Sequence, residues 1–239
     1  WHNGTRTVSR VQHNMGSGGP MRERSETQQR LVEAARIVMI NYGIEGCTQQ
    51  RICKEAGLTR GAFYSNYATK EELFTHVARD AYARIIERLD EIVERWAAQP
   101  STQPGGQPEV KVAEFLGSAQ VELGLNREFF ILHNELLSRA AREPEWALQF
   151  REINRDFVLR VAQVLELIVN EVGRTLDRRP EAVAQAVIGI ALRVTGVSAW
   201  KTELINDNDT FEPRGTMLEA DDIVDMILTL LFACSKPMV

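Results

Sequence analysis

The side chains best suited to specific recognition lie close together in the segment GLTRGAFYSNY, residues 57–67. Arg60 can form two parallel hydrogen bonds with the edge of a guanine, and Asn66 can do the same with an adenine. Tyr64 and Ser65 add hydroxyl groups of the kind that contact phosphate oxygens. These residue types at this spacing predict a surface that fits the major groove of duplex DNA.

Two short helices joined by a tight turn must position these groups. Thr48 is placed to cap the first helix, and Thr59 is placed to cap the second. Ala56 is small where the helices cross, Gly57 lets the chain reverse, and Leu58 fills the core beneath the turn. This arrangement predicts a helix-turn-helix.

The second of these helices has two faces with different roles. We expect Ala62, Phe63 and Tyr67 to pack against the preceding helices. The outward set is then Arg60, Gly61, Tyr64, Ser65 and Asn66. Gly61 and Ala62 also keep the helix slim enough to approach base edges and a thymine methyl group.

Helices on both sides complete a three-helix unit and lead into the rest of the chain. The capping box Ser25–Gln28 predicts a helix start, with Leu31, Ala35, Val38 and Tyr42 facing inward and Gly43 ending the helix. A second capping box at Thr69–Glu72 predicts a long helix over 69–98. Its apolar stripe comprises Leu73, Val77, Ala81, Ile85, Leu89, Ile92 and Trp96.

The segment from Arg30 to Leu73 resembles the DNA-binding domain of the tetracycline-repressor (TetR) family. The matching stretches are LVEAARIVMINYGIEGCT, Ile52, EAGLTRGAFYSNY and TKEEL, which are ordered and spaced as in that family. The resemblance implies an all-helical, homodimeric transcription factor, usually a repressor that a small ligand releases from its operator. The predicted DNA-binding residues are Thr48, Gln49, Gln50, Thr59, Arg60, Gly61, Ala62, Tyr64, Ser65, Asn66, Tyr67 and Lys70.

We therefore expect an all-α fold with two functional domains. Residues 22–68 form the helix-turn-helix domain, and residues 69–239 form a helical effector-binding and dimerisation domain. A Pro- and Gly-rich linker over 97–109 separates the long helix from later helices predicted near 110–123, 127–142, 145–172, 180–205 and 219–235. Residues 1–21 are expected to be a disordered tail or an expression leftover, with a basic DNA-touching arm as the alternative.

The last two predicted helices carry more apolar surface than one core can cover. Residues 180–204 alternate branched apolar residues with small ones, and residues 223–234 are apolar on more than one side. A two-fold interface of two helices from each subunit would cover this surplus, as it does in the resembled family. The predicted interface residues are Val187, Ala191, Val194, Val224, Ile227 and Leu231; a monomer with a large core is the alternative.

Aromatic residues between the linker and these helices predict a pocket for a hydrophobic or flat effector. The predicted lining is Trp96, Phe115, Phe129, Phe130, His133, Trp146, Phe150 and Trp200, with ordinary core packing as the alternative. We expect effector binding to shift the long helix over 69–98 and so to change the spacing of the two DNA-binding units. A coupling of about 1–3 kcal/mol would weaken operator binding roughly 5- to 150-fold.

Composition limits the other classes of function. The chain has 239 residues, a net charge of −5, and 44% hydrophobic and 26% charged residues, which is ordinary for a soluble protein and leaves room for a local basic face. It has no uninterrupted apolar run of about 18 residues, and no phosphate loop, nucleophile elbow or metal motif. Three cysteines, Cys47, Cys53 and Cys234, suggest reduced thiols in a cytoplasmic protein, with redox sensing by Cys47 or Cys53 as the alternative. We expect no cofactor, no metal, no membrane association and no enzymatic activity; a helical interaction module is the main competing function.

Overall fold

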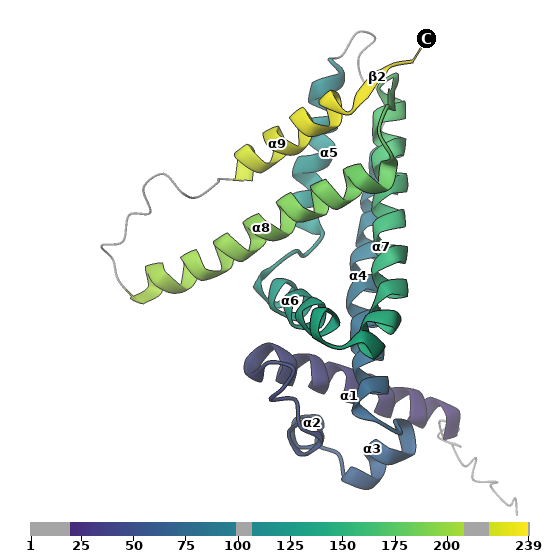
Figure 1. Cartoon of the computed structure of the whole chain (residues 1–239), viewed down its shortest axis with the longest axis vertical. Helices are drawn as coiled ribbons and strands as arrows, with labels where there is room; N and C mark the ends of the chain where they lie inside the picture. The colour runs from purple at the N-terminus through teal and green to yellow at the C-terminus, as the bar shows by residue number, and fades with distance from the viewer. Residues whose placement is uncertain (1–19, 99–106, 208–219, 239) are drawn as a thin grey trace, which may run out of the picture.

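The computed structural model describes residues 20–98, 107–207 and 220–238; the side chains of 20–23, 200–207, 220 and 221 lie outside that description. The expected tail at 1–21 and most of the linker at 97–109 therefore fall outside the described residues. Within them the chain is almost entirely helical (Figure 1). The elements are α1 (Pro20–Tyr42), α2 (Gln49–Ala56), α3 (Arg60–Asn66), α4 (Lys70–Ala97), α5 (Pro108–Glu122), α6 (Arg127–Arg142), α7 (Pro144–Glu171), β1 (Arg174–Leu176), α8 (Pro180–Asp207), α9 (Ala220–Ala233) and β2 (Ser235–Pro237).

Local sequence signals account for most helix ends. Gly43, Gly57, Gly124 and Gly173 adopt the left-handed conformation, and Pro108 and Pro144 open their helices. The Thr69 hydroxyl accepts from the Glu72 N–H at 3.1 Å, and the Glu72 carboxylate accepts from the Ala68 N–H at 2.9 Å, so the predicted cap of α4 forms.

The expected start of α1 at Ser25 was wrong. The helix begins at Pro20, because Pro suits the first helical position and the residues that follow it, MRER, are good helix formers. Tyr42, expected on the inward face, is exposed instead. The guanidinium of Arg51 lies 4.7 Å from its ring centroid.

The α1–α3 unit and the rest of the chain share one core. Leu31 and Val38 of α1, Ile52 of α2 and Phe63 of α3 are buried in the same cluster as the first half of α4. Phe129, Trp146 and other residues of α6 and α7 belong to this cluster as well. A shift of α4 or α6 would therefore directly change the packing of α1–α3.

The long helices α4 and α7 pack side by side and carry the body above the α1–α3 unit (Figure 1). A second buried cluster joins the later half of α4 to α5, α7, α8 and α9. Helices α5 and α9 pack against each other, and α8 packs on α6 and α7, so the body encloses the space between α4, α5, α8 and α9.

No strand was expected from the sequence, but β1 and β2 pair antiparallel with Thr175 opposite Lys236. Arg174 holds this pair: its guanidinium donates to the Ser235 carbonyl at 2.6 Å and to the Phe232 carbonyl at 3.1 Å. The pair ties the segment after α9 to the connection between α7 and α8. Two strands of three residues are too short to show a period-two pattern.

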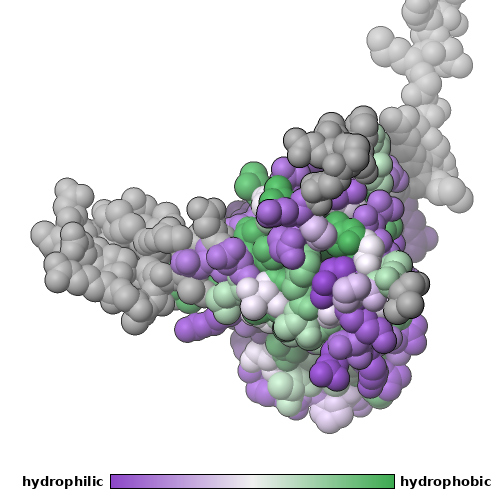
Figure 2. Space-filling view, turned by 90° about the horizontal axis from the view of Figure 1, so that it is seen from above, coloured by the Kyte–Doolittle hydropathy of each residue, from purple (hydrophilic) through white to green (hydrophobic). Residues whose placement is uncertain are grey.

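Helix α8 is unusually apolar for its burial. Pro180–Ala199 is long and apolar enough to cross a membrane by length and composition, and 22% of that span is buried. A single helix of this kind is weak evidence for a membrane span, because helices at the core of soluble proteins meet the same criteria. Figure 2, which looks down on the end of the molecule that carries β2, shows apolar residues set among hydrophilic ones.

Candidate nucleic-acid interface and internal cavity

Helices α2 and α3 form the predicted helix-turn-helix with every expected cap in place. The Thr48 hydroxyl accepts from the Arg51 N–H at 3.3 Å, and the Thr59 hydroxyl accepts from the Ala62 N–H at 3.1 Å. Gly57 has a φ of 61°, which lets the chain reverse, and the Leu58 N–H donates to the Cys53 carbonyl at 2.9 Å. The turn is therefore fixed by backbone geometry.

The two faces of α3 divide as the sequence predicts, except that Asn66, expected to face solvent, is half-buried. Phe63 is 1% exposed, whereas Tyr64, the next residue, is 62% exposed. Their rings meet edge to face with centroids 5.7 Å apart, so the buried ring supports the exposed one. Arg60, Gly61 and Ser65 are exposed, and Ala62 is half-buried.

Tyr67 was wrongly included among the surface residues. It is 1% exposed, and its hydroxyl lies 3.0 Å from Nδ1 of His76 on α4. Burial, with a smaller effect from Glu72, raises the pKa of Tyr67 to about 12. Tyr67 thus fastens the end of α3 to α4 and is a support for the exposed face.

Several side chains on this face are already hydrogen-bonded within the protein. The Tyr64 hydroxyl donates to Oε1 of Gln49 at 3.2 Å, which links α3 to α2. Ser65 and Asn66 bond back to their own helix, at the carbonyls of Gly61 (2.9 Å) and Ala62 (2.8 Å). Arg60 is the exposed group on α3 that is best placed to reach outward, whereas Asn66 would first have to leave its helix.

The N-terminal ends of α2 and α4 flank this face. Thr48, Gln49, Tyr64, Thr69 and Lys70 line a shallow recess where α2, α3 and α4 meet. Free N–H groups at helix N-termini and a lysine make such a recess suitable for phosphate oxygens. Both helix starts therefore face the same side as the exposed residues of α3.

The local charge is opposite in sign to that of the whole chain. Residues 48–70 contain four basic residues (Arg51, Lys54, Arg60, Lys70) and one acidic residue (Glu55), a balance of +3, whereas the chain carries −5. A basic face on an acidic protein favours a polyanion at this site and disfavours it elsewhere.

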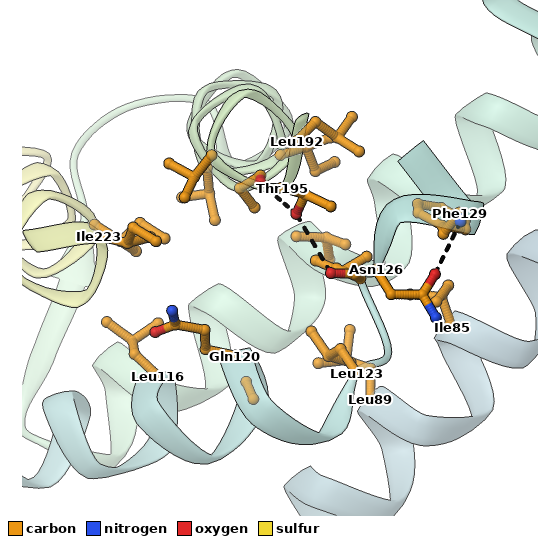
Figure 3. A pocket seen from close by; sticks show the side chains of 18 of the residues that line it. Ile85, Leu89, Leu116, Gln120, Leu123, Asn126, Phe129, Leu192, Thr195 and Ile223 are labelled. Atoms are coloured by element: carbon orange, nitrogen blue, oxygen red, sulfur yellow. Dashed lines mark hydrogen bonds between the residues drawn. The ribbon is translucent and has the colours of Figure 1, made fainter. Parts of the chain in front are cut away.

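The body contains an apolar cavity of about 580 Å³ (Figure 3). Its walls come from α4 through α9, with Ile85 and Leu89 on α4 and Phe129 on α6 among them. Its polar groups are few: Gln120, Asn126, Arg127, Thr195 and Ser198. A concave, mainly apolar site of this volume fits a drug-sized small molecule.

Most of the residues predicted to line the pocket do not reach it. Phe115 and Phe129 line the cavity, but Trp96, Phe130, His133, Trp146 and Phe150 are not among its lining residues. The side chain of Trp200 lies outside the described residues.

The misplaced aromatic residues have structural roles instead. Trp146 stacks on Phe150 with centroids 6.2 Å apart and donates its indole N–H to the Leu136 carbonyl at 3.1 Å. The Tyr82 hydroxyl lies 2.6 Å from Nδ1 of His133, and both groups are buried. Burial lowers the pKa of His133 and raises that of Tyr82, so the pair is neutral.

The residues predicted for the dimer interface face the inside of the subunit. Val187, Ala191, Val194, Val224 and Ile227 line the cavity, and Leu231 is fully buried. The outward face of α8 carries Ala182, Gln185, Ala186, Gly189 and Arg193. The apolar excess of α8 was recognised correctly, but its two faces were exchanged.

Cys47 and Cys53 are buried, which does not favour redox sensing. Burial raises the pKa of Cys47 to about 12 and also raises that of Cys53. Because the thiolate is the reactive form, both thiols are poorly reactive in the folded protein.

Comparisons with known proteins agree with this anatomy. Residues 31–77 match the family described as bacterial regulatory proteins, tetR family. The HTH-type transcriptional repressor AcnR of Corynebacterium efficiens is 35% identical over 65 residues, which are 27% of this chain and 35% of that protein. The regulator SrpR of Pseudomonas putida is 38% identical over 55 residues, or 23% of this chain and 26% of that protein. The matches thus span about a third or less of these relatives.

Solved structures share the fold over nearly the whole chain. A TetR-family structure from Mesorhizobium loti has a TM-score of 0.62 and 15% identity, covering 89% of this chain and 98% of that one. FadR from Bacillus subtilis, solved in complex with stearoyl-CoA, has a TM-score of 0.57 and 17% identity, covering 85% of this chain and 96% of that one. Residues 31–77 therefore carry the DNA-binding domain of the tetR family of bacterial regulatory proteins, and the chain as a whole shares the all-helical fold of the solved structures.

Proposed function

We propose that this protein is a homodimeric transcriptional repressor that binds a near-palindromic operator and is released by an apolar small molecule. The observation that carries the proposal is the capped, outward-facing side of α3, where Arg60 and Tyr64 project from a helix whose opposite side is buried. The regulator names of the relatives favour this function over an enzyme. As a DNA-binding regulator, the protein would act in the cytoplasm.

The DNA contacts divide by chemistry. Arg60 would read a guanine in the major groove, because its exposed guanidinium can donate two parallel hydrogen bonds. Tyr64, Lys70 and the helix starts at Thr48 and Thr69 would contact phosphates and fix the register. Gln49, Gln50, Thr59, Gly61, Ala62, Ser65 and Asn66 remain proposed members of this surface.

Dimerisation is proposed from the outward face of α8. Ala182, Ala186 and Gly189 form a stripe of small residues on that exposed face, and the helix is apolar for its low burial. A second copy of α8 could approach this stripe closely and cover it. Pairing would place two α3 helices on one side of a duplex, in major grooves about 34 Å apart.

The cavity is the proposed effector site. It is apolar and of ligand size, and a relative of the same fold has been solved with stearoyl-CoA, a molecule with a long apolar chain. Ile85 and Leu89 place the middle of α4 in its wall, so a ligand there would press on the helix that leads to α3. This supports the expected movement of α4.

Helix α6 provides a second route from the cavity to the DNA-binding unit. Its first residues, Asn126–Phe129, lie in or beside the cavity wall. Farther along, the Glu135 carboxylate accepts from the Ile44 N–H at 2.8 Å, just after α1. Arg36 of α1 pairs with Glu128 at 2.8 Å, so α1 is held at two points of α6. Displacement of α6 by a ligand would tilt α1 and the two helices packed on it.

Selection of bound duplexes from random DNA with the full-length protein would test this function. We expect an inverted repeat whose half-sites are centred about one helical turn apart. Enrichment of a single half-site would contradict the dimer. No enrichment at any salt concentration would contradict DNA recognition and favour a helical interaction module.

A further inference from the structure

Gln120 is the polar side chain of the cavity whose hydrogen-bonding capacity is unused. It lies near the end of α5, and Figure 3 shows its amide reaching into the space between α5, α8 and Ile223 of α9. No described residue gives this amide a hydrogen bond. Its neighbours in the wall, Leu116 and Ile223, are apolar.

Each of the other polar side chains of the cavity takes part in at least one interaction within the protein. The Thr195 hydroxyl donates to the Ala191 carbonyl at 2.9 Å, and the Asn126 side chain accepts from the Phe129 N–H at 3.0 Å. Arg127 and Ser198 take part in further interactions of their own. Gln120 therefore offers both a donor and an acceptor to whatever occupies the cavity.

The Gln120 side chain is half-buried among apolar residues, and its amide has no hydrogen-bond partner among the described residues. A ligand oxygen that hydrogen-bonds the amide would fix the ligand's orientation. Precisely placed polar groups in an otherwise apolar pocket act in this way.

The few charged residues in the cavity wall also restrict the charge that the ligand can carry. Among the described lining residues there is no Asp, Glu, Lys or His, and Arg127 is the one charged residue. A cationic ligand would be desolvated without an opposing charge, which is strongly unfavourable. An anion would have to compete for Arg127, which already has other interactions.

We propose that the effector is a neutral, largely apolar molecule with one hydroxyl or carbonyl oxygen, and that Gln120 recognises this oxygen. The assignment rests on the proposed function of the cavity as the effector site. Beyond that function, the assignment specifies the charge state of the ligand and the residue that recognises its oxygen.

Competition against a hydrocarbon fluorophore, 1,6-diphenylhexatriene, tests the assignment in the full-length protein at neutral pH. The competitors are 1-decanol, decanoate and decylammonium, which share one chain and differ in the head group. The wild type should bind decanol most tightly. Gln120→Leu should weaken decanol binding about tenfold, equivalent to 1.4 kcal/mol, and leave the hydrocarbon's affinity unchanged or stronger. Gln163→Leu, on the exposed face of α7, is the matched control and should change neither the affinity for decanol nor the affinity for the fluorophore.

Equal decanol affinity in the wild type and Gln120→Leu would overturn the role of Gln120. A preference for decanoate or decylammonium in the wild type would overturn the neutral ligand. Failure of the wild type to bind the fluorophore would overturn the cavity as a site, while leaving the DNA-binding proposal standing. Decanol binding that depends on Gln120 but leaves operator affinity unchanged would support the present assignment and contradict the proposed release mechanism.

Discussion

At the scale of single residues, the buried pair of Tyr82 and His133 stands out. The two side chains share a 2.6 Å hydrogen bond between α4 and α6, and the Tyr82 ring also contacts Phe129 and Phe157 of the cavity wall. Burial holds His133 neutral by lowering its pKa. The pair therefore joins the two helices that connect the cavity to α1–α3.

Stability should fall as the pH drops below the ordinary histidine pKa of 6.5. In that range the unfolded chain binds a proton at His133 that the folded chain resists, so the free energy of unfolding decreases with decreasing pH. Replacing His133→Asn keeps a hydrogen-bond acceptor for Tyr82 and removes the titration. Urea unfolding at pH 7.5 and 5.5 should show a smaller loss in the variant than in the wild type. An equal loss in both would show that His133 is not the titrating group.

The outward residues of α3 could be predicted from the sequence, but the details of their bonding could not. Helical spacing separates Phe63 from Tyr64, because consecutive residues on a helix point about 100° apart. Spacing does not reveal that Asn66 bonds to its own helix or that Tyr67 finds His76 on α4. Those partners depend on where α4 crosses α3, which is a tertiary property.

At the scale of elements, α6 is the helix of the body that makes hydrogen bonds and ion pairs with α1, the loop after it and the start of α4. Glu135 accepts from the Ile44 N–H, Glu128 pairs with Arg36, and Arg139 reaches Glu71 at 3.4 Å in the first turn of α4. The start of the same helix forms part of the cavity wall. One rigid element thus contacts both proposed sites.

Glu135→Ala should lower the free energy of unfolding by about 1–3 kcal/mol, because it leaves the N–H of buried Ile44 without a partner. It should also speed hydrogen exchange at the Ile44 amide. Glu166→Ala, at an exposed glutamate near the end of α7, is the control and should change stability by less than about 0.5 kcal/mol. Unchanged exchange at Ile44 would mean that Glu135 does not hold the loop after α1.

The type and order of the helices were predictable, whereas the direction of their apolar faces was not. Glycine, proline and capping residues mark the ends of α2 through α8 within a few residues. In α8, however, Val187 and Ala191 on one side and Ala186 and Gly189 on the other are all apolar or small. Periodicity alone cannot say which side lines the cavity, so residues of the cavity wall, such as Val187 and Ala191, were predicted as interface residues. Gln120 was missed because a single amide in an amphipathic helix carries no pattern.

At the scale of the whole molecule, the proposed function requires two copies held at a fixed spacing. The exposed stripe of α8 is the proposed contact, and the cavity lies directly behind it, lined by Val187 and Ala191. A ligand in the cavity would therefore be close to the dimer contact as well as to α4 and α6.

Gly189→Glu should convert the dimer to a monomer. An added Cβ at Gly189 meets nothing within 4 Å in the subunit, so the change would not disturb the subunit itself, but it would place charges against each other across the two-fold axis. Light scattering after size exclusion should give twice the 27.0 kDa chain mass for the wild type and the single chain mass for the variant. Gly117→Glu, also in a helix with open space, is the matched control. A Gly189→Glu protein that remains dimeric would place the interface elsewhere.

The most direct test of the central claim is the affinity of the wild type and three variants for the selected operator at one salt concentration, measured by fluorescence anisotropy. Arg60→Ala should weaken the binding free energy for the operator by about 1–3 kcal/mol. It should also remove the base preference at one position of each half-site. Lys70→Ala should weaken binding to all sequences alike, and Lys236→Ala in β2, at the far end of the molecule, should bind like the wild type. If Arg60→Ala and Lys70→Ala both bound the operator as tightly as Lys236→Ala, the α2–α3 face would not be the DNA-binding surface.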